Sequence, residues 1–261
     1  MESDAAFEIL YRDRHLLVVD KAPGIAVQSA SLREKDLTDR IRREILAPGD
    51  GAGGYLGIVH RLDQPVRGLV VFALDKKSAA NLSEQTGGEK MRKVYLALVK
   101  TENPSMLPEF GEIRTLENDL LKDARTNRSF PVPKGTRGAK HAALQYRRVS
   151  LEEAEAEKLN EDWIPGPGEA LLEIRLQTGR HHQIRVQMAA AGLPVKGDRK
   201  YGQTRTQEQL PYPMLCALKL EFTHPATGKR MCFTSRQVLA KNPVLSFNNG
   251  QENSHAVKKG S

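Results

Sequence analysis

The chain has 261 residues, enough for one large domain with a substantial core or for two small ones. It carries 40 basic and 32 acidic residues, a formal charge of +8, and its sequence pI is about 9.5. A basic excess of this size favours a polyanionic partner and argues against an acidic one, although solubility alone would also account for it. Two cysteines, Cys216 and Cys232, exclude a disulfide framework and have neither CxxC nor tight metal spacing.

The N-terminal segment MESDAAFEIL is acidic and lacks the apolar core of a signal peptide. No apolar run approaches the length of a membrane span. Together with the small number of cysteines, these features predict a cytoplasmic protein with no membrane partner. A monomer is the default expectation.

The first half of the chain predicts alternating strands and helices. Residues 7–24 indicate two strands joined by a polar turn and followed by a Pro-Gly turn. Residues 37–46 place apolar side chains four positions apart, which is typical of a short amphipathic helix. Residues 69–74 form a β-rich run, and residues 76–88 predict a helix ended by glycines. Residues 93–100 carry apolar groups on both faces, as a central strand does.

The second half begins with an irregular stretch. Residues 101–140 are rich in Pro, Gly, Lys and Arg and predict a long connection of the kind that often binds ligands. The acidic residues 150–163 begin with the spacing of a capping box and predict a solvated, helix-like insertion. Residues 170–180 alternate in polarity as a half-buried strand does, and residues 181–194 change to helical spacing.

Strands outnumber helices and do not alternate strictly with them, and no repeat or hinge-like linker interrupts the chain. We therefore predict an α+β fold, a single domain over residues 1–240 around a mixed, mostly antiparallel β-sheet with flanking helices and loops. Periodicity is lost after about residue 240, so residues 241–261 are expected to form a flexible tail.

The segment HRLDQPVRG places Asp63 between two arginines, directly before an apolar run. Catalytic side chains are commonly presented at strand ends. A carboxylate in a dry cleft needs a cationic partner, because desolvation favours its protonated form. The plain alternative is a turn aspartate before Pro65.

A second candidate segment, TGRHHQIR, lies at the junction of the predicted strand and helix. Arg180 lies near the helix start, where free backbone N–H groups favour an anion. Arg185 lies one turn into the helix at the boundary of its apolar face, from where it could reach inward to a carboxylate. The alternative is that both arginines are surface charges.

Metal and cofactor sites find no support in the sequence. His60, Asp63, His181 and His182 offer ligand atoms, but H-x-x-D on a loop and an adjacent histidine pair match no standard metal site. The chain also lacks the motifs of P-loops, dinucleotide-binding folds and serine-hydrolase elbows. We expect no metal and no cofactor.

Five segments, taken in order, resemble the RluA-type family of RNA pseudouridine synthases. They are ILYRDRHLLVVDKAPGIAVQ, HRLDQPVRGLVVFA, KVYLALV, TGRHHQIRVQMAAAGLPVKGDRKYG and CALKLEFTHPATG, which together extend over residues 7–235. Two positions differ from the family pattern: Gln187 replaces a second histidine, and Arg67 replaces a small Ser or Thr. The S4-type RNA-binding domain of many relatives is expected to be absent, so the core itself would hold RNA.

The resemblance implies the pseudouridine synthase fold and the isomerisation of a uridine already in RNA. The C–N glycosidic bond breaks, the uracil rotates and a bond to C5 forms, without redox change or net hydrolysis. The family's catalytic aspartate corresponds to Asp63, acting as nucleophile or as base. Tyr95 would stack on the flipped base and assist proton removal at C5. Arg185 would hold Asp63 charged and oriented.

The resemblance also points to residues that bind RNA, either rRNA or tRNA. The target base must be flipped out of its stack, at a cost of a few kcal/mol. Arg61 and Arg180 would hold the vacated stack or the phosphate, and His60 and His181 flank them. The basic stretch Lys122–Lys140 is expected to clamp the RNA backbone.

Two other classes remain open from the sequence. One is an RNA-binding protein that kept the fold and lost the activity, against which the presence of Asp63, Tyr95 and Arg185 argues. The other is a hydrolase of a small glycoside or nucleoside. That reaction needs a second acid across the scissile bond, and no other carboxylate is clearly paired with Asp63.

Overall fold

A computed structural model describes residues 6–29, 36–46, 54–88, 90–154, 159–202 and 210–238. Within these ranges the strands are β1 (Phe7–Arg12), β2 (Leu16–Lys21), β3 (Gly57–Ile58), β4 (Arg67–Ala73), β5 (Arg92–Lys100), β6 (Ile113–Asp123), β7 (Arg128–Val132), β8 (Lys140–Arg148), β9 (Glu169–Leu176), β10 (Leu215–Thr223) and β11 (Arg230–Thr234). The α-helices are α1 (Leu37–Glu44), α2 (Lys76–Gly87) and α3 (Gln183–Ala190), and the 3-10 turns are η1 (Pro104–Met106) and η3 (Glu161–Trp163).

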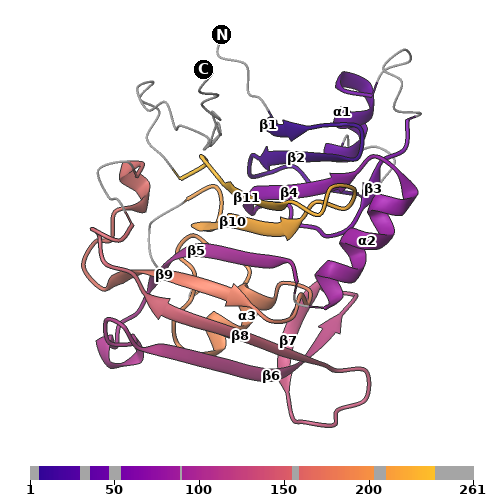
Figure 1. The fold of residues 1–261 in the computed structure, drawn as a ribbon. Helices are drawn as coiled ribbons and strands as arrows, with labels where there is room; N and C mark the ends of the chain where they lie inside the picture. The colour runs from indigo at the N-terminus through magenta and orange to yellow at the C-terminus, as the bar shows by residue number, and fades with distance from the viewer. Residues whose placement is uncertain are drawn as a thin grey trace, which may run out of the picture.

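All of these strands join one sheet. Its order is β1-β2-β4-β10-β5-β9-β8-β6-β7, with β11 added to β10 and β3 to β4 (Figure 1). Among the described strand pairs only β4–β10 is parallel. The predicted mixed, mostly antiparallel sheet is therefore confirmed, as is the central place of β5, which lies between β10 and β9.

Alternation along the strands separates two cores. We call the face that carries Phe72 and Tyr95 the front face, where the helices α1 and α3 pack. The back face carries Val71 and Leu96 and is covered at one end by α2, through Leu82. Since neighbouring side chains of a strand point to opposite faces, a single strand serves both cores.

The predicted helices form where local signals start and stop them. Asp36 caps α1 by accepting a hydrogen bond of 2.9 Å from the N–H of Asp39. Asp75 caps α2 in the same way, with 2.8 Å to the N–H of Ser78, and this helix ends at Gly88 as predicted. α3 begins at Gln183, two residues after the start of the predicted helical segment.

The prediction of an irregular connection over residues 101–140 is wrong. Residues 113–132 of this stretch form β6, β7 and the turn between them, a hairpin at the edge of the sheet. Its turn is fixed by Asp123, which accepts from the N–H of Arg125 at 2.9 Å and the hydroxyl of Thr126 at 2.7 Å. Asn127 then adopts the left-handed φ of 50°. Half-exposed strands lack the apolar alternation by which strands are predicted.

The predicted acidic helix also needs correction. The capping-box bonds form between Ser150 and Glu153, at 3.1 and 3.2 Å, but residues 151–154 are a turn, and η3 adds only one 3-10 turn. The segment is not simply solvated either, because Leu159 and Trp163 are buried against the back face. Their apolar side chains outweigh the acidic composition of their neighbours.

The predicted tail over residues 241–261 lies outside the described residues, and the domain boundary at residue 240 stays a prediction. None of the helices in the described ranges combines the length and the apolar character that a membrane crossing requires.

Candidate active site

The candidate site lies on the front face where β4, β10 and β5 meet. Ala217 of β10 lies opposite Gly68 on one side and opposite Tyr95 on the other. Gly68 has φ of 115°, and a side chain there would begin 2.5 Å from the carbonyl oxygen of Ala217. Only glycine permits this close approach. It lets β4 pack closely against β10, so the loop that carries Asp63, directly before β4, is separated from Tyr95 of β5 by one strand.

Asp63 and Arg185 form an ion pair across more than a hundred positions of sequence. Nη1 of Arg185 donates to Oδ2 of Asp63 at 3.2 Å. The two other guanidinium nitrogens, Nε and Nη2, donate to Oδ2 and Oδ1 of Asp198 at 2.7 and 2.8 Å. Arg185 therefore binds one carboxylate with a bidentate fork and offers its remaining nitrogen to the other.

Asp198 is a residue that the sequence interpretation missed. It is buried, and its Oδ1 also accepts from the N–H groups of Lys200 and Tyr201, at 2.9 and 3.2 Å. Burial is the largest influence and raises its pKa, but the hydrogen bond and charge of Arg185, together with the two backbone N–H groups, lower the pKa of Asp198 below its ordinary value. Burial lowers the pKa of Arg185, whereas the two carboxylates raise it, and the net effect is a rise. The signal in the sequence that could have pointed to Asp198 is the G-D-x-x-Y-G pattern, in which it is the aspartate.

Tyr95 lies on the same face and is buried. Burial raises the pKa of its phenol, and the negative charge of Asp63 raises it further. The phenol is therefore protonated at neutral pH and close enough to Asp63 to feel its charge.

Two histidines precede α3. His182 is buried, its Nδ1 lies 2.8 Å from the Tyr201 hydroxyl, and its Nε2 lies 3.7 Å from Oδ2 of Asp63. Burial lowers the pKa of His182 to about 4, against the opposing effect of Asp63. His181 stacks on His182 with 3.7 Å between ring centroids, and its Nδ1 lies 2.9 Å from Oγ of Ser129. His182 belongs to the site, although the sequence interpretation considered it only as a metal ligand.

Lys21, a second residue that the sequence interpretation missed, holds the loop that carries Asp63. Its buried amine donates to the carbonyl oxygens of Ala22, Ile25 and Gln64 at 3.0, 2.9 and 3.2 Å. Burial lowers the pKa of Lys21 to about 7, while the charge of Asp63 opposes the fall. Because Gln64 follows Asp63 directly, this amine fixes the backbone on which the carboxylate stands.

The structure also describes the other predicted RNA contacts. Arg61 and Arg180 are exposed, and Nε of Arg180 donates to the carbonyl oxygen of His141 at 2.7 Å. His60 instead accepts, through Nε2, from the N–H of Val71 at 3.1 Å, and burial lowers the pKa of its ring to about 3. His60 thus ties the loop to β4, and its contact with RNA stays a prediction.

Comparison with known proteins decides the family. Residues 15–190 match the family model described as RNA pseudouridylate synthase. The chain belongs to this family. It is 32% identical over 285 residues to the chloroplastic RNA pseudouridine synthase 2 of Arabidopsis thaliana, covering 88% of this chain and 62% of that relative. It is 29% identical to the ribosomal large subunit pseudouridine synthase D of Zymomonas mobilis, covering 94% of this chain and 75% of the relative.

A third relative is the tRNA pseudouridine synthase C of Pectobacterium carotovorum, with 30% identity over 88% of this chain and 58% of the relative. Several of these relatives are thus considerably longer than this chain. The solved structure of human RNA Pseudouridylate Synthase Domain Containing 1 aligns with a TM-score of 0.65 and 22% identity, over 90% of this chain and 86% of that one. The human Domain Containing 4 protein gives 0.61 and 21%, over 90% and 88%. The pseudouridine synthase fold is confirmed.

Both departures from the family pattern have structural explanations. Arg67 begins β4 on the back face, with Cζ 5.8 Å from the ring centroid of Trp163, so it flanks Asp63 only in sequence. Burial lowers the pKa of Arg67. Gln187 is buried on α3, and its Nε2 donates to Oδ1 of Asn118 at 2.9 Å and to the carbonyl oxygen of Ala142 at 3.3 Å. It therefore fastens α3 to β6 and β8.

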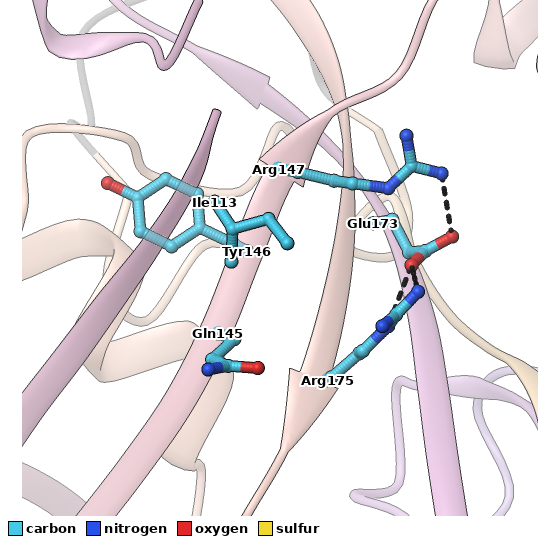
Figure 2. A pocket seen from close by; sticks show the side chains of 6 residues that line it. All are labelled: Ile113, Gln145, Tyr146, Arg147, Glu173 and Arg175. Carbon is cyan, nitrogen blue, oxygen red and sulfur yellow. Dashed lines mark hydrogen bonds and ion pairs between the residues drawn. The ribbon is translucent and has the colours of Figure 1, made fainter. Parts of the chain in front are cut away.

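A shallow hollow elsewhere on the sheet is not part of this site. It is lined by Ile113, Gln145, Tyr146, Arg147, Glu173 and Arg175 (Figure 2). Glu173 lies opposite Leu96 and so on the back face. Its carboxylate is occupied by Arg147 at 3.2 Å and Arg175 at 2.8 Å, which leaves little charge for a ligand. Within the described ranges no group of His, Cys, Asp and Glu has the arrangement of a metal site.

Proposed function

We propose that this chain is an RNA pseudouridine synthase, which isomerises one or more uridines of structured RNA, rRNA or tRNA, with Asp63 and without a cofactor. The observation that carries the proposal is the ion pair of 3.2 Å between Asp63 and Arg185 on the front face, next to Tyr95. The names of the three relatives above support the substrate class: one names RNA, one the large ribosomal subunit and one tRNA.

The reaction moves one bond and one proton. The bond between N1 and C1′ breaks, a bond between C5 and C1′ forms, the proton of C5 leaves and N1 gains one. Asp63 assists the cleavage as nucleophile or base, and the hydrogen bond of 3.2 Å from Arg185 orients its carboxylate for either role. The flat ring of Tyr95 stacks on the flipped base, and its hydroxyl assists removal of the C5 proton.

RNA is held by the basic groups around the site. Arg61 and Arg180 are exposed and take the place of the flipped base or bind phosphate. His181 and His60 complete the set of RNA-binding residues. The hairpin within Lys122–Lys140 clamps the RNA backbone. Its place near the site is supported by His181, because burial and the nearby charge of Lys122 both lower the pKa of the His181 ring. The proposal includes a monomer that acts in the cytoplasm and needs no membrane.

An RNA-binding protein without activity is the second candidate, and the site argues against it. A carboxylate at the centre of a cleft for RNA repels phosphate, and a pure binder has no need of it. Here two carboxylates, Asp63 and Asp198, and one buried arginine are held in a defined arrangement.

Tritium release tests the proposal directly, because the isomerisation expels the C5 hydrogen. RNA is taken from cells that lack this gene, after growth with uridine tritiated at C5. The chain should release tritium to water, whereas Asp63→Asn should release none and bind the RNA within about tenfold of the original affinity. Asp162→Asn, at an exposed aspartate of η3, serves as the matched control and should keep full activity. Full activity of Asp63→Asn would overturn the assignment of Asp63.

A further inference from the structure

His182 stands at a costly backbone position. It is the N-cap of α3, yet its φ of 54° and ψ of 25° are left-handed and its side chain makes no capping bond. Residues at this position normally adopt extended backbone and cap the helix with a side-chain oxygen, as Asp36 and Asp75 do for α1 and α2. Left-handed non-glycine residues persist only where their surroundings enforce them. The surroundings here direct the imidazole toward Asp63.

The contacts of the ring define its protons. The Tyr201 oxygen accepts from the N–H of Ser129 at 2.8 Å, and its hydroxyl proton is then free for Nδ1 of His182, also at 2.8 Å. Burial keeps the ring neutral, so a ring that accepts at Nδ1 carries its proton at Nε2. Nε2 faces the negative oxygen of Asp63. A proton on Nε2 is attracted to this oxygen, whereas a lone pair on Nε2 would be repelled by it.

The two oxygens of Asp63 are therefore unequal. Oδ2 receives Nη1 of Arg185 at 3.2 Å and faces Nε2–H of His182 at 3.7 Å. No residue in the described ranges forms a hydrogen bond with Oδ1. We propose that His182 is a positioning residue that, together with Arg185, holds Oδ2 and leaves Oδ1 as the reacting oxygen; this inference rests on the proposed function.

A neutral donor suits this task better than a second cation. Arg185 already places a positive charge 3.2 Å from Asp63, and more positive charge would weaken the carboxylate as nucleophile or base. The N–H of a neutral imidazole adds direction with little charge. The chain from Ser129 through Tyr201 to His182 also connects the β6–β7 hairpin to the reacting carboxylate.

His182→Gly is the decisive variant, because glycine adopts the left-handed backbone freely and leaves a hole of the shape of imidazole. With enzyme in excess over the tritiated RNA, we expect the rate at saturating enzyme to fall at least about tenfold, and the half-saturating enzyme concentration to change less than about threefold. Free imidazole should raise the rate of this variant at least about fivefold and have no effect on Asp63→Asn. His15→Gln, at a histidine paired with Asp75 far from the site, is the matched control.

A second variant covers the case in which His182→Gly does not fold. Tyr201→Phe keeps the ring that lies 5.3 Å from Cζ of Arg185 and removes only the hydroxyl bound to Nδ1. It should lower the saturating rate at least about threefold at unchanged half-saturation. Nitrogen-15 NMR adds a measurement independent of RNA, and should show the neutral ring protonated at Nε2 at pH 7 in the original chain.

The results distinguish a failure of the proposed function from a failure of the proposed role of His182. If the original chain releases no tritium, the proposed function fails, and NMR alone then decides the arrangement of His182. If the chain is active, the role of His182 is overturned by a saturating rate within about threefold of the original in His182→Gly, or by a loss that imidazole does not restore. For Tyr201→Phe, an unchanged rate overturns it. A ring protonated at Nδ1, or a charged ring, overturns it in either case.

Discussion

Asp198 binds Arg185 through both carboxylate oxygens, at 2.7 and 2.8 Å, whereas Asp63 receives a single hydrogen bond of 3.2 Å from the same guanidinium. The buried pair therefore fixes the plane of the arginine, and the remaining nitrogen is aimed at the carboxylate of the site. Without Asp198, the plane of this guanidinium would not be fixed, and Nη1 would no longer be aimed at Asp63.

Replacement of Asp198 should therefore damage both stability and activity. Asp198→Asn keeps the shape but loses the charge, so the buried Arg185 is left with weaker partners and the free energy of unfolding should fall by about 3 kcal/mol. The saturating rate of tritium release should fall at least about tenfold, because the aim of Nη1 is lost. Denaturant unfolding and single-turnover kinetics measure the two effects. Unchanged values for both would contradict the positioning role of Asp198.

Stability should depend on pH through two histidines, His60 and His182, whose pKa values are lowered by desolvation. The folded pKa values of His60 and His182 lie at about 3 and about 4, below the unfolded value of about 6.5, so the unfolded chain binds more protons between these limits. The free energy of unfolding should therefore decrease as pH falls. Asp20 opposes the decrease, because burial raises its pKa to about 6. The net loss between pH 6.5 and 4.5 should be about 3 kcal/mol.

Urea unfolding at several pH values measures this dependence, with His60→Gln as the comparison. The variant should lose less stability than the original chain over the same interval, since it no longer carries one of the two groups. An original chain that becomes more stable as pH falls from 6.5 to 4.5 would contradict the assignment.

Lys21→Met tests the support beneath Asp63. The change keeps the length of the side chain but leaves the carbonyl oxygens of Ala22, Ile25 and Gln64 without their donor. The free energy of unfolding should fall by about 2 kcal/mol, and the rate of tritium release should fall because the backbone after Asp63 is released. Lys77→Met, at an exposed lysine of α2, should change neither value.

Gly68→Ala tests the junction of β4 and β10. Its side chain would begin 2.5 Å from the carbonyl oxygen of Ala217, at φ of 115°, and the loss of stability should exceed about 2 kcal/mol. Gly228→Ala separates strain from collision, because Gly228 also has positive φ, 71°, but has open space around its Cα. The Gly228 variant should lose about 1 kcal/mol. Equal losses in the two variants would count against a collision at Gly68.

Most of the fold was predictable because local patterns determine it. Apolar groups on both faces of residues 93–100 predicted the central strand β5, and the spacing of Leu37 and Ile41 predicted α1. The β6–β7 hairpin was not predicted, because its half-exposed strands carry charges on the positions that a buried strand fills with apolar groups. Its turn depends on Asp123 and on the left-handed Asn127, signals that composition does not reveal.

The site was predictable in part. The resemblance of motifs pointed to Asp63 and Arg185, and the structure places them in contact. Asp198 was missed because only the folded chain shows that a second acid binds the edge of the Arg185 guanidinium formed by Nε and Nη2. His182 was missed because hydrophobic spacing does not reveal a left-handed φ. Arg67 appeared to flank Asp63, but its position on β4 directs it to the back face.

Mapping of pseudouridines in cellular RNA shows most plainly whether this chain makes pseudouridine with Asp63. Three cell populations are compared: cells lacking the gene, the same cells given the original chain, and the same cells given Asp63→Asn at equal protein level. We expect defined uridines of rRNA or tRNA to be modified only with the original chain. Identical maps in all three populations, or full modification with Asp63→Asn, would contradict this expectation.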